Sequence, residues 1–209
     1  MVKNLKARLY LELSVLIPSD YMLSQMIKYN RILLNRNEIE MIRKTVKHKA
    51  PCNLLIWGLG NDSVFWTKVN RGGTTLFLED NKIWFQKVNK KRKRLKAFLV
   101  DYNTQRTQWR ELLESEDLLV IDLPKLVKET KWDIVIVDGP AGYSDTDSGR
   151  MKSIYLTSKL ADEHCDVFVH DCDRQIEDIY CNRFLKKKNL KTEIDRLRHY
   201  RLIYNESFH

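Results

Sequence analysis

Two groups of acidic residues come directly after apolar runs in the second half of the chain. Asp138 follows the run "WDIVIV", and "VFVHDCD" places His170, Asp171 and Asp173 at the end of another. If both runs are neighbouring parallel strands, their carboxyl ends lie about 5 Å apart at one edge of a sheet. We therefore expect Asp138 and Asp171 to converge on one point.

Carboxylates that converge in this way support either of two chemistries. Asp138, Asp171 and Asp173 are candidate ligands for a divalent metal ion (Mg, Mn or Co), which would lower the pKa of an acceptor hydroxyl. Alternatively, one carboxylate is a general base whose pKa is raised by its neighbour. Asp173 also suits the N-cap of the segment "RQIEDIY". The candidate catalytic residues are Asp138, His170 and Asp171.

A glycine-containing loop follows the earlier apolar run "NLLIW". Glycine lets the backbone turn sharply and lets a ligand approach it closely. Glu79 ends the next apolar run about 20 residues later, the spacing at which an acidic residue holds a ribose. Position 63 is serine, so the full G-x-G-x-x-G pyrophosphate site is absent, which favours S-adenosyl-L-methionine over a dinucleotide. The candidate cofactor-binding residues here are Gly58, Gly60, Asn61, Asp62, Ser63 and Glu79, with Asp138 beside them.

The adenine of such a cofactor needs a flat surface and a hydrogen-bond acceptor. Tyr102, in "LVDY", is a candidate to cover one face of the ring. Asp101 and Asp122 are candidates to accept from its amino group. For each of the three, an exposed strand end or a helix cap is the alternative.

The polar segment "GYSDTDSGRMKSIY" follows Asp138 closely and is expected to form a loop over the site, with a helix beginning near Arg150. Loops at this place commonly carry specificity. Tyr143 and Arg150 are candidate substrate-binding residues. Arg150 could pair in bidentate fashion with an anionic acceptor such as a uronate carboxylate.

The elements that must position these residues alternate between strand and helix. Strands are expected at 52–59, 74–80, 95–102, 132–140 and 165–173, with helices at 62–69, 81–89, 105–118, 150–163 and from 174. The last two strands, "KTEIDRL" and "YRLIYN", are too closely linked to be parallel. This α/β pattern predicts the Rossmann-like class I methyltransferase fold, a mostly parallel sheet with a C-terminal antiparallel hairpin. We expect one domain over 1–209, with a helical N-terminal extension (1–50) and a Rossmann-like core (51–209).

The composition excludes some classes of protein and leaves others open. Hydrophobic residues make up 43% of the 209-residue chain, and no apolar run reaches the roughly 20 residues of a membrane span. The four cysteines lack metal-finger spacing. The net charge is +9, with a basic run "NKKRKRLK" that is either a solvated connection between helix and strand or a surface for an anionic polysaccharide, another acidic partner or a nucleic acid.

Several segments together resemble the glucuronoxylan 4-O-methyltransferase family of polysaccharide-biosynthesis proteins. They are "APCNLLIWGLGNDSVFW", "GGTTLFLED", "WDIVIVDGPAGY", "GRMKSIY" and "DVFVHDCDR", and the resemblance covers about residues 50–184. It implies methyl transfer from S-adenosyl-L-methionine to the 4-hydroxyl of glucuronic acid on xylan, with a divalent metal associated with activity. By motif position, residues 58–63 resemble the donor loop, Glu79 the ribose residue, and Asp138 with His170–Asp171 the catalytic region.

The chain departs from the family at two motif positions, where Asn61 replaces a histidine and Gly139 an alanine. The plant members carry a membrane anchor and work in the Golgi; without a signal or anchor, this chain is expected to be cytoplasmic. The predicted function is O-methylation of a sugar hydroxyl on a glycan, either glucuronic acid or another sugar such as a deoxyhexose. The alternatives are a nucleic-acid-binding or nucleic-acid-modifying methyltransferase and a non-catalytic partner in glycan assembly.

Overall fold

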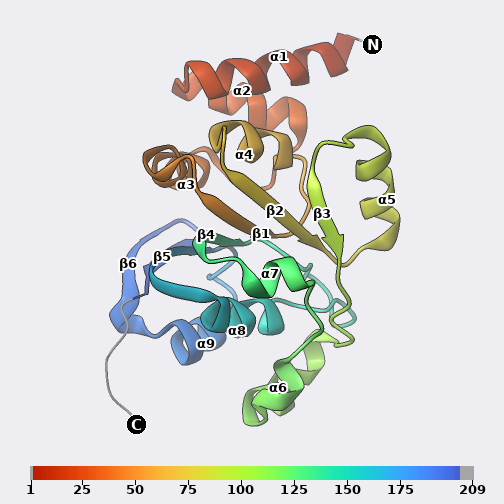
Figure 1. Cartoon of the computed structure of the whole chain (residues 1–209), viewed down its shortest axis with the longest axis vertical. Helices are drawn as coiled ribbons and strands as arrows, with labels where there is room; N and C mark the ends of the chain where they lie inside the picture. Colours follow the sequence, from red (N-terminus) through yellow and green to blue (C-terminus); the bar gives the residue numbers. More distant parts are fainter. Residues whose placement is uncertain (1, 203–209) are drawn as a thin grey trace.

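The computed structural model describes residues 2–202 and is built around one seven-stranded sheet (Figure 1). The strand order is β3-β2-β1-β4-β5-β7-β6. Strands β1 to β5 are parallel, and β7 and β6 close the edge as an antiparallel pair. This confirms the predicted parallel sheet with its final hairpin. The strands are β1 (Asn53–Trp57), β2 (Thr74–Glu79), β3 (Lys96–Leu99), β4 (Trp132–Val137), β5 (Ala161–Val169), β6 (Leu190–Ile194) and β7 (Leu197–Arg201).

Helices cover both faces of the sheet, as the near-continuous apolar strands require (Figure 1). One face packs against the first five helices and the other against the last four. The first five are α1 (Val2–Leu16), α2 (Asp20–Asn30), α3 (Arg36–Lys49), α4 (Ser63–Val69) and α5 (Lys82–Lys91). The last four are α6 (Trp109–Glu114), α7 (Lys125–Glu129), α8 (Met151–Leu160) and α9 (Gln175–Tyr180).

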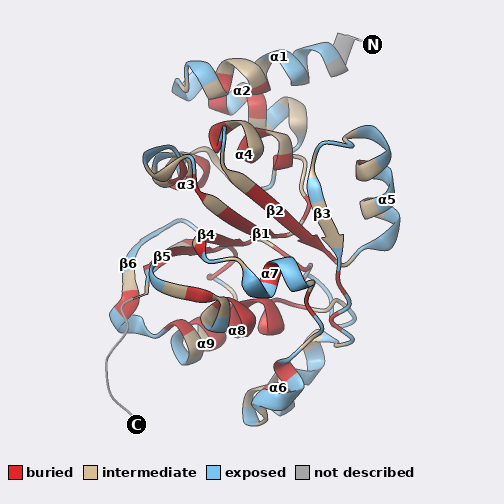
Figure 2. Cartoon of the chain, in the orientation of Figure 1, coloured by how far each residue is buried: buried red, intermediate tan, exposed pale blue. Residues whose placement is uncertain are grey.

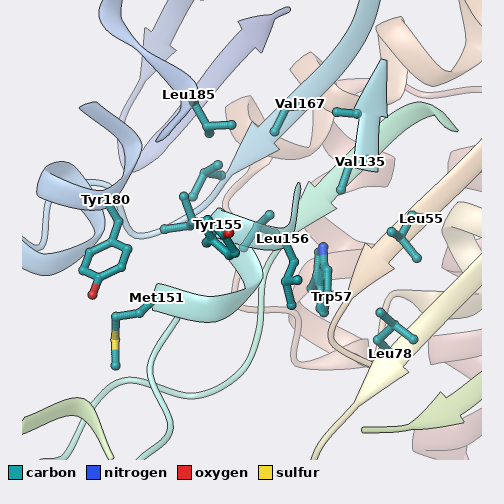
Figure 3. Close-up of a cluster of buried hydrophobic side chains, with 14 of the residues drawn as sticks. Leu55, Trp57, Leu78, Val135, Met151, Tyr155, Leu156, Val167, Tyr180 and Leu185 are labelled. Atoms are coloured by element: carbon teal, nitrogen blue, oxygen red, sulfur yellow. The ribbon is translucent and has the colours of Figure 1, made fainter. Parts of the chain in front are cut away.

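Burial is concentrated in the central strands and in α8, whereas α5 and α6 expose much of their surface (Figure 2). Side chains of α8, including Tyr155 and Leu156, pack between the sheet and Tyr180 of α9 (Figure 3). The indole nitrogen of Trp57 on β1 donates to the hydroxyl of Thr157, 2.9 Å away. This packing fixes α8, and with it the loop that precedes the helix.

The N-terminal helices are part of the same packed structure. Ile39, Ile42 and Val46 lie on one side of α3 and are fully buried with residues of β1 and β4. Asn35 and Glu38 form a reciprocal capping box that begins this helix. Among residues 2–202, no helix has the length and apolar character needed to cross a membrane.

Several predicted elements differ from the structure. Helix α8 ends at Leu160 and β5 begins at Ala161, so residues 161–163 of the predicted helix belong to a strand, and α7 was not predicted. The segment 105–118 is not one helix but two short 3₁₀ turns on either side of α6. The final hairpin turns at Asp195–Arg196, three residues earlier than predicted, because Asp195 adopts the left-handed conformation (φ 52°) that a tight turn needs. This register buries Leu197 and Tyr200. Residues 203–205 of the predicted last strand lie outside the described residues.

Candidate active site

A cavity of about 580 Å³ lies at the carboxyl ends of β1, β2 and β4. This is the edge at which ligands bind in open parallel sheets. Its walls come from the glycine loop after β1, the end of β2, the segment 138–150 and, unexpectedly, the connection between α2 and α3. The volume is within the usual range for small-molecule sites.

Gly58 begins the loop and cannot readily be replaced. Its φ is +113°, and an added Cβ would lie 3.3 Å from the carbonyl oxygen of Asp138. Gly139 is equally restricted, since its added Cβ would lie 3.0 Å from Gly58 Cα. The backbones after β1 and β4 are thus in close contact, which brings Asp138 to the glycine loop.

Glu79 ties the end of β2 to the loop. Its two carboxylate oxygens accept from the backbone N–H groups of Leu59 (3.0 Å) and Asn81 (2.8 Å). Burial raises the pKa of Glu79 to about 7, although both hydrogen bonds act in the opposite direction. Each oxygen retains a lone pair, so Glu79 can still accept from a ribose hydroxyl. Asp80 and Trp84 line the same part of the cavity.

Asp62 and Asn61 also line the cavity, whereas Ser63 does not. Asp62 accepts from the indole N–H of Trp66 (2.7 Å), and burial raises its pKa to about 6. The hydroxyl of Ser63 donates to the carbonyl of Gly60 (2.9 Å), so this residue stabilises the loop from behind.

Asp138 is the acidic residue at the end of β4 that faces the cavity. Its Oδ1 lies 2.9 Å from Nδ1 of His170 and 3.2 Å from an amino nitrogen of Arg150. Among the described residues, none donates a hydrogen bond to Oδ2. One carboxylate oxygen is therefore fixed and the other is open to a ligand.

His170 lies behind Asp138 and does not line the cavity. Its Nε2 is 3.3 Å from Oε2 of Glu38, outside hydrogen-bond geometry. Burial alone would lower the pKa of His170, but Asp138 and Glu38 outweigh this and raise it to about 9. The ring is thus an imidazolium between two carboxylates at neutral pH.

Asp171 is fully buried and surrounded by arginines, not by metal ligands. Its oxygens lie 2.5 Å from Arg150, 3.0 Å from Arg174 and 2.9 Å from Arg196. Burial would raise the pKa of this carboxyl, but the neighbouring cations lower it.

The three predicted metal ligands, Asp138, Asp171 and Asp173, do not converge on one point. Asp173 is exposed and lies outside the cavity, and the lone pairs of Asp171 face three guanidinium groups. Within residues 2–202 there is no cluster of three or more His, Cys, Asp or Glu suited to a metal ion. Asp173 does not cap the following helix either, because Arg174 occupies the N-cap position.

Arg150 has a different place from the one predicted. It borders the cavity, but its side chain is only 3% exposed, and it also donates to the carbonyl of His170 (2.6 Å). Its contacts with Asp138 and Asp171 leave it poorly placed to pair with an acceptor carboxylate.

The loop before α8 does cover the cavity. Asp147 accepts from the backbone N–H groups of Tyr143 and Ser144, both at 2.7 Å, and an ion pair between Arg106 and Asp145 holds the loop from outside. Tyr143 lines the cavity, is 65% exposed and lies under the guanidinium of Arg174.

Of the residues predicted to bind adenine, Tyr102 lines the cavity and the two aspartates do not. Asp101 is exposed and accepts from the N–H of Asn103 (2.9 Å), as a turn residue does. Asp122 is almost fully exposed, beside Lys128. The structure therefore places neither aspartate at the cavity, and their predicted contacts with adenine have no support in its geometry.

Sequence reasoning missed the contributions of the N-terminal region and of the hairpin. Arg31 to Leu34 line the cavity, and Glu38 and Arg196 support the residues behind it. The Asn-x-x-Glu pattern at Asn35–Glu38 is typical of a helix start and could have predicted where α3 begins. It does not indicate that Glu38 contacts His170.

A family model described as IRX15/IRX15L/GXM matches residues 37–117 and 115–200, which is most of the chain. The chain belongs to this family. The chain is similar to glucuronoxylan 4-O-methyltransferase 3 of Arabidopsis thaliana, with 38% identity over 78% of this chain and 62% of that protein. Arabinogalactan O-methyltransferase 2 of the same plant is 33% identical over 79% of this chain and 65% of its own length. The chain thus spans less than two thirds of the relatives it matches.

A solved structure of low sequence identity shows the same fold. It is a Staphylococcus aureus protein assigned as a caffeoyl-CoA O-methyltransferase, with a TM-score of 0.54 and 12% identity over 94% of this chain and 99% of that chain. This likeness confirms the predicted Rossmann-like class I methyltransferase fold.

Proposed function

We propose that this chain is an S-adenosyl-L-methionine-dependent O-methyltransferase that acts on a sugar hydroxyl of a glycan or polysaccharide. The observation that carries the proposal is the open Oδ2 of Asp138, which borders the same cavity as the glycine loop and Glu79. Family relatives named for O-methylation of glucuronoxylan and arabinogalactan support the choice of acceptor.

The cavity suits the methyl donor. Gly58 and Gly60 expose backbone, Glu79 offers carboxylate lone pairs to ribose hydroxyls, and Tyr102 offers a ring edge or face to adenine. The absence of a third glycine is no obstacle, since this donor carries no pyrophosphate. When bound, the donor supplies a methyl group on a positively charged sulfur.

Asp138 acts on the acceptor. Its free Oδ2 accepts the hydrogen bond of the sugar hydroxyl and takes the proton as the oxygen attacks. Arg150 and His170 hold Oδ1, so the carboxylate keeps one orientation and the hydroxyl oxygen is aligned for transfer. No step is assigned to a divalent cation, because the residues at the end of β5 do not fit one.

Asp138→Asn tests this assignment. The amide keeps the shape but loses the basic oxygen, so we expect methyl transfer to fall by at least about a hundredfold, with donor affinity nearly unchanged. Donor binding would be measured by calorimetry, and transfer with labelled donor and a panel of glycans. Asp122→Asn, an exposed aspartate outside the cavity, is the matched control.

Two results would contradict the proposal. Transfer by Asp138→Asn at the wild-type rate would remove Asp138 from catalysis. Failure of the wild-type protein to bind the donor would remove the methyltransferase assignment and favour a non-catalytic role in glycan assembly.

A further inference from the structure

We propose that Glu38, on the N-terminal helix α3, is a positioning residue for methyl transfer: it fixes the ring of His170, which in turn orients Asp138. The inference rests on the proposed function and extends it to a residue outside the cavity. On this proposal, the N-terminal extension positions a residue of the active site in addition to packing against the sheet.

The three side chains form a continuous series. Glu38 Oε2 lies 3.3 Å from Nε2 of His170, and Nδ1 on the other side of the ring lies 2.9 Å from Oδ1 of Asp138. The side chains of Glu38 and His170 are 0% and 2% exposed, and that of Asp138 is 24% exposed. The series therefore runs from the protein interior to the cavity.

Glu38 itself is rigidly held. Its Oε2 accepts from the N–H of Asn35 at 2.7 Å, and its Oε1 accepts from the N–H of Arg196 at 3.1 Å. One contact comes from the start of α3 and the other from the turn between β6 and β7. A carboxylate fixed from two sides gives His170 one preferred ring orientation.

The orientation of His170 decides which oxygen of Asp138 meets a ligand. With Nδ1 bound to Oδ1, the other oxygen remains free on the cavity side. Without an acceptor near Nε2, the ring can rotate or flip, and Asp138 then loses one of the two groups that fix it. We expect this to misplace the reacting hydroxyl and not to prevent binding of either substrate.

Other charged groups around His170 do not replace Glu38. Asp171 Oδ1 lies 3.6 Å from Nδ1, on the side already occupied by Asp138, and is paired with Arg150 and Arg196. Asp62 acts on the ring only at longer range. Among the described residues, Glu38 is the acidic group placed next to Nε2.

Glu38→Gln separates the proposed role from helix capping. Glutamine is as suitable as glutamate at the third position of a capping box, so α3 should still form. The variant removes the charge beside Nε2; its amide oxygen can still accept from the N–H of Asn35, and its amino group takes the place of the oxygen that accepts from Arg196. Glu40→Gln is the matched control, since Glu40 lies on the same helix and pairs with Arg43 instead.

The first measurement is kinetic. We expect Glu38→Gln to lower kcat by about tenfold or more, with KM for donor and acceptor within about twofold, and Glu40→Gln to behave like wild type. In a His170→Gln background, adding Glu38→Gln should cause no further loss, because both changes interrupt one series. Multiplicative losses in the double variant would overturn the proposal.

The second measurement does not depend on turnover. In the free protein with ¹⁵N-labelled histidine, the wild type should show a slowly exchanging Nδ1–H signal from His170 by NMR, because this N–H is hydrogen-bonded to Asp138. The signal should broaden or disappear in Glu38→Gln, where the ring is no longer fixed, and persist in Glu40→Gln. An unchanged signal in Glu38→Gln would overturn this inference, whether or not the protein methylates a glycan. Absence of methyl transfer by the wild type would instead count against the proposed function.

Discussion

At the scale of single residues, chemistry at this site depends on which atoms are already engaged. His170 is held as an imidazolium with each ring nitrogen next to a carboxylate, so it has no free lone pair with which to accept a proton. Asp138 keeps one oxygen free and faces the cavity. We therefore assign proton acceptance to Asp138 and positioning to His170.

The backbone conformation of Gly58 also matters at the scale of a single residue. Alanine there would have to adopt φ +113° and would crowd the carbonyl of Asp138, so we expect Gly58→Ala to lower the free energy of unfolding by about 1–3 kcal/mol. Donor affinity should fall as well, because the loop must move. Gly142→Ala is the control, since an added Cβ there meets only side-chain ends and Gly149 at 3.3–3.5 Å. Equal unfolding midpoints for the two variants in urea would contradict this account of Gly58.

At the scale of elements, Asp171 connects segments that are distant in the sequence. Arg150 precedes α8, Arg174 occupies the N-cap position of α9, and Arg196 lies in the turn between β6 and β7. Arg196 also donates to the carbonyl of Leu33, before α3. A buried carboxylate with three cationic partners thus holds together the elements that surround Asp138.

Asp171→Asn should therefore be strongly destabilising. It leaves three guanidinium groups without their common anion, which we expect to cost about 3–5 kcal/mol of unfolding free energy. Asp173→Asn makes the same chemical change two residues away at an exposed position, and we expect an effect below about 0.5 kcal/mol. Chemical denaturation of the two variants measures the difference. A small effect at Asp171, or a large one at Asp173, would contradict the proposed arrangement.

At the scale of the whole molecule, the helices on the two faces of the sheet contribute different residues to the site. The face covered by α6 to α9 provides one of the two groups that hold Asp138, Arg150 at the start of α8. The face covered by α1 to α5 brings the α2–α3 connection over the cavity and Glu38 against His170. We propose that residues 1–50 and 51–209 unfold as one unit, because α3 shares its buried contacts with β1 and β4.

His170 makes the stability of the whole molecule depend on pH. Its pKa is raised to about 9 in the folded protein from an ordinary value of 6.5, so its stabilising contribution is complete below about pH 6.5 and disappears as the pH rises through 9. We expect the free energy of unfolding to fall over this window by on the order of 3 kcal/mol. The raised pKa values of Asp62 and Glu79, about 6 and 7, act mainly below it.

Urea denaturation between pH 7 and 9 measures this dependence. His170→Gln should abolish most of the slope, and His48→Gln, at an exposed position, should retain it. A wild-type stability that stays constant up to pH 9 would show that His170 is not held as a cation.

The sequence by itself determined the order of elements and the edge at which the site lies. Strand ends and glycines are local features, so "GLGND", Glu79, Tyr102 and Asp138 could be placed on one edge from the parallel topology alone. The tertiary structure decided which charged groups face one another. Nothing local distinguishes Asp171 from Asp138 or links Glu38 to His170, because their partners come from α3, α8 and the final hairpin, up to 158 residues away. Burial and neighbouring charge set the protonation of each acidic or basic side chain, and its hydrogen-bond partners set its orientation. The role of each charged residue at the site therefore depends on these distant contacts.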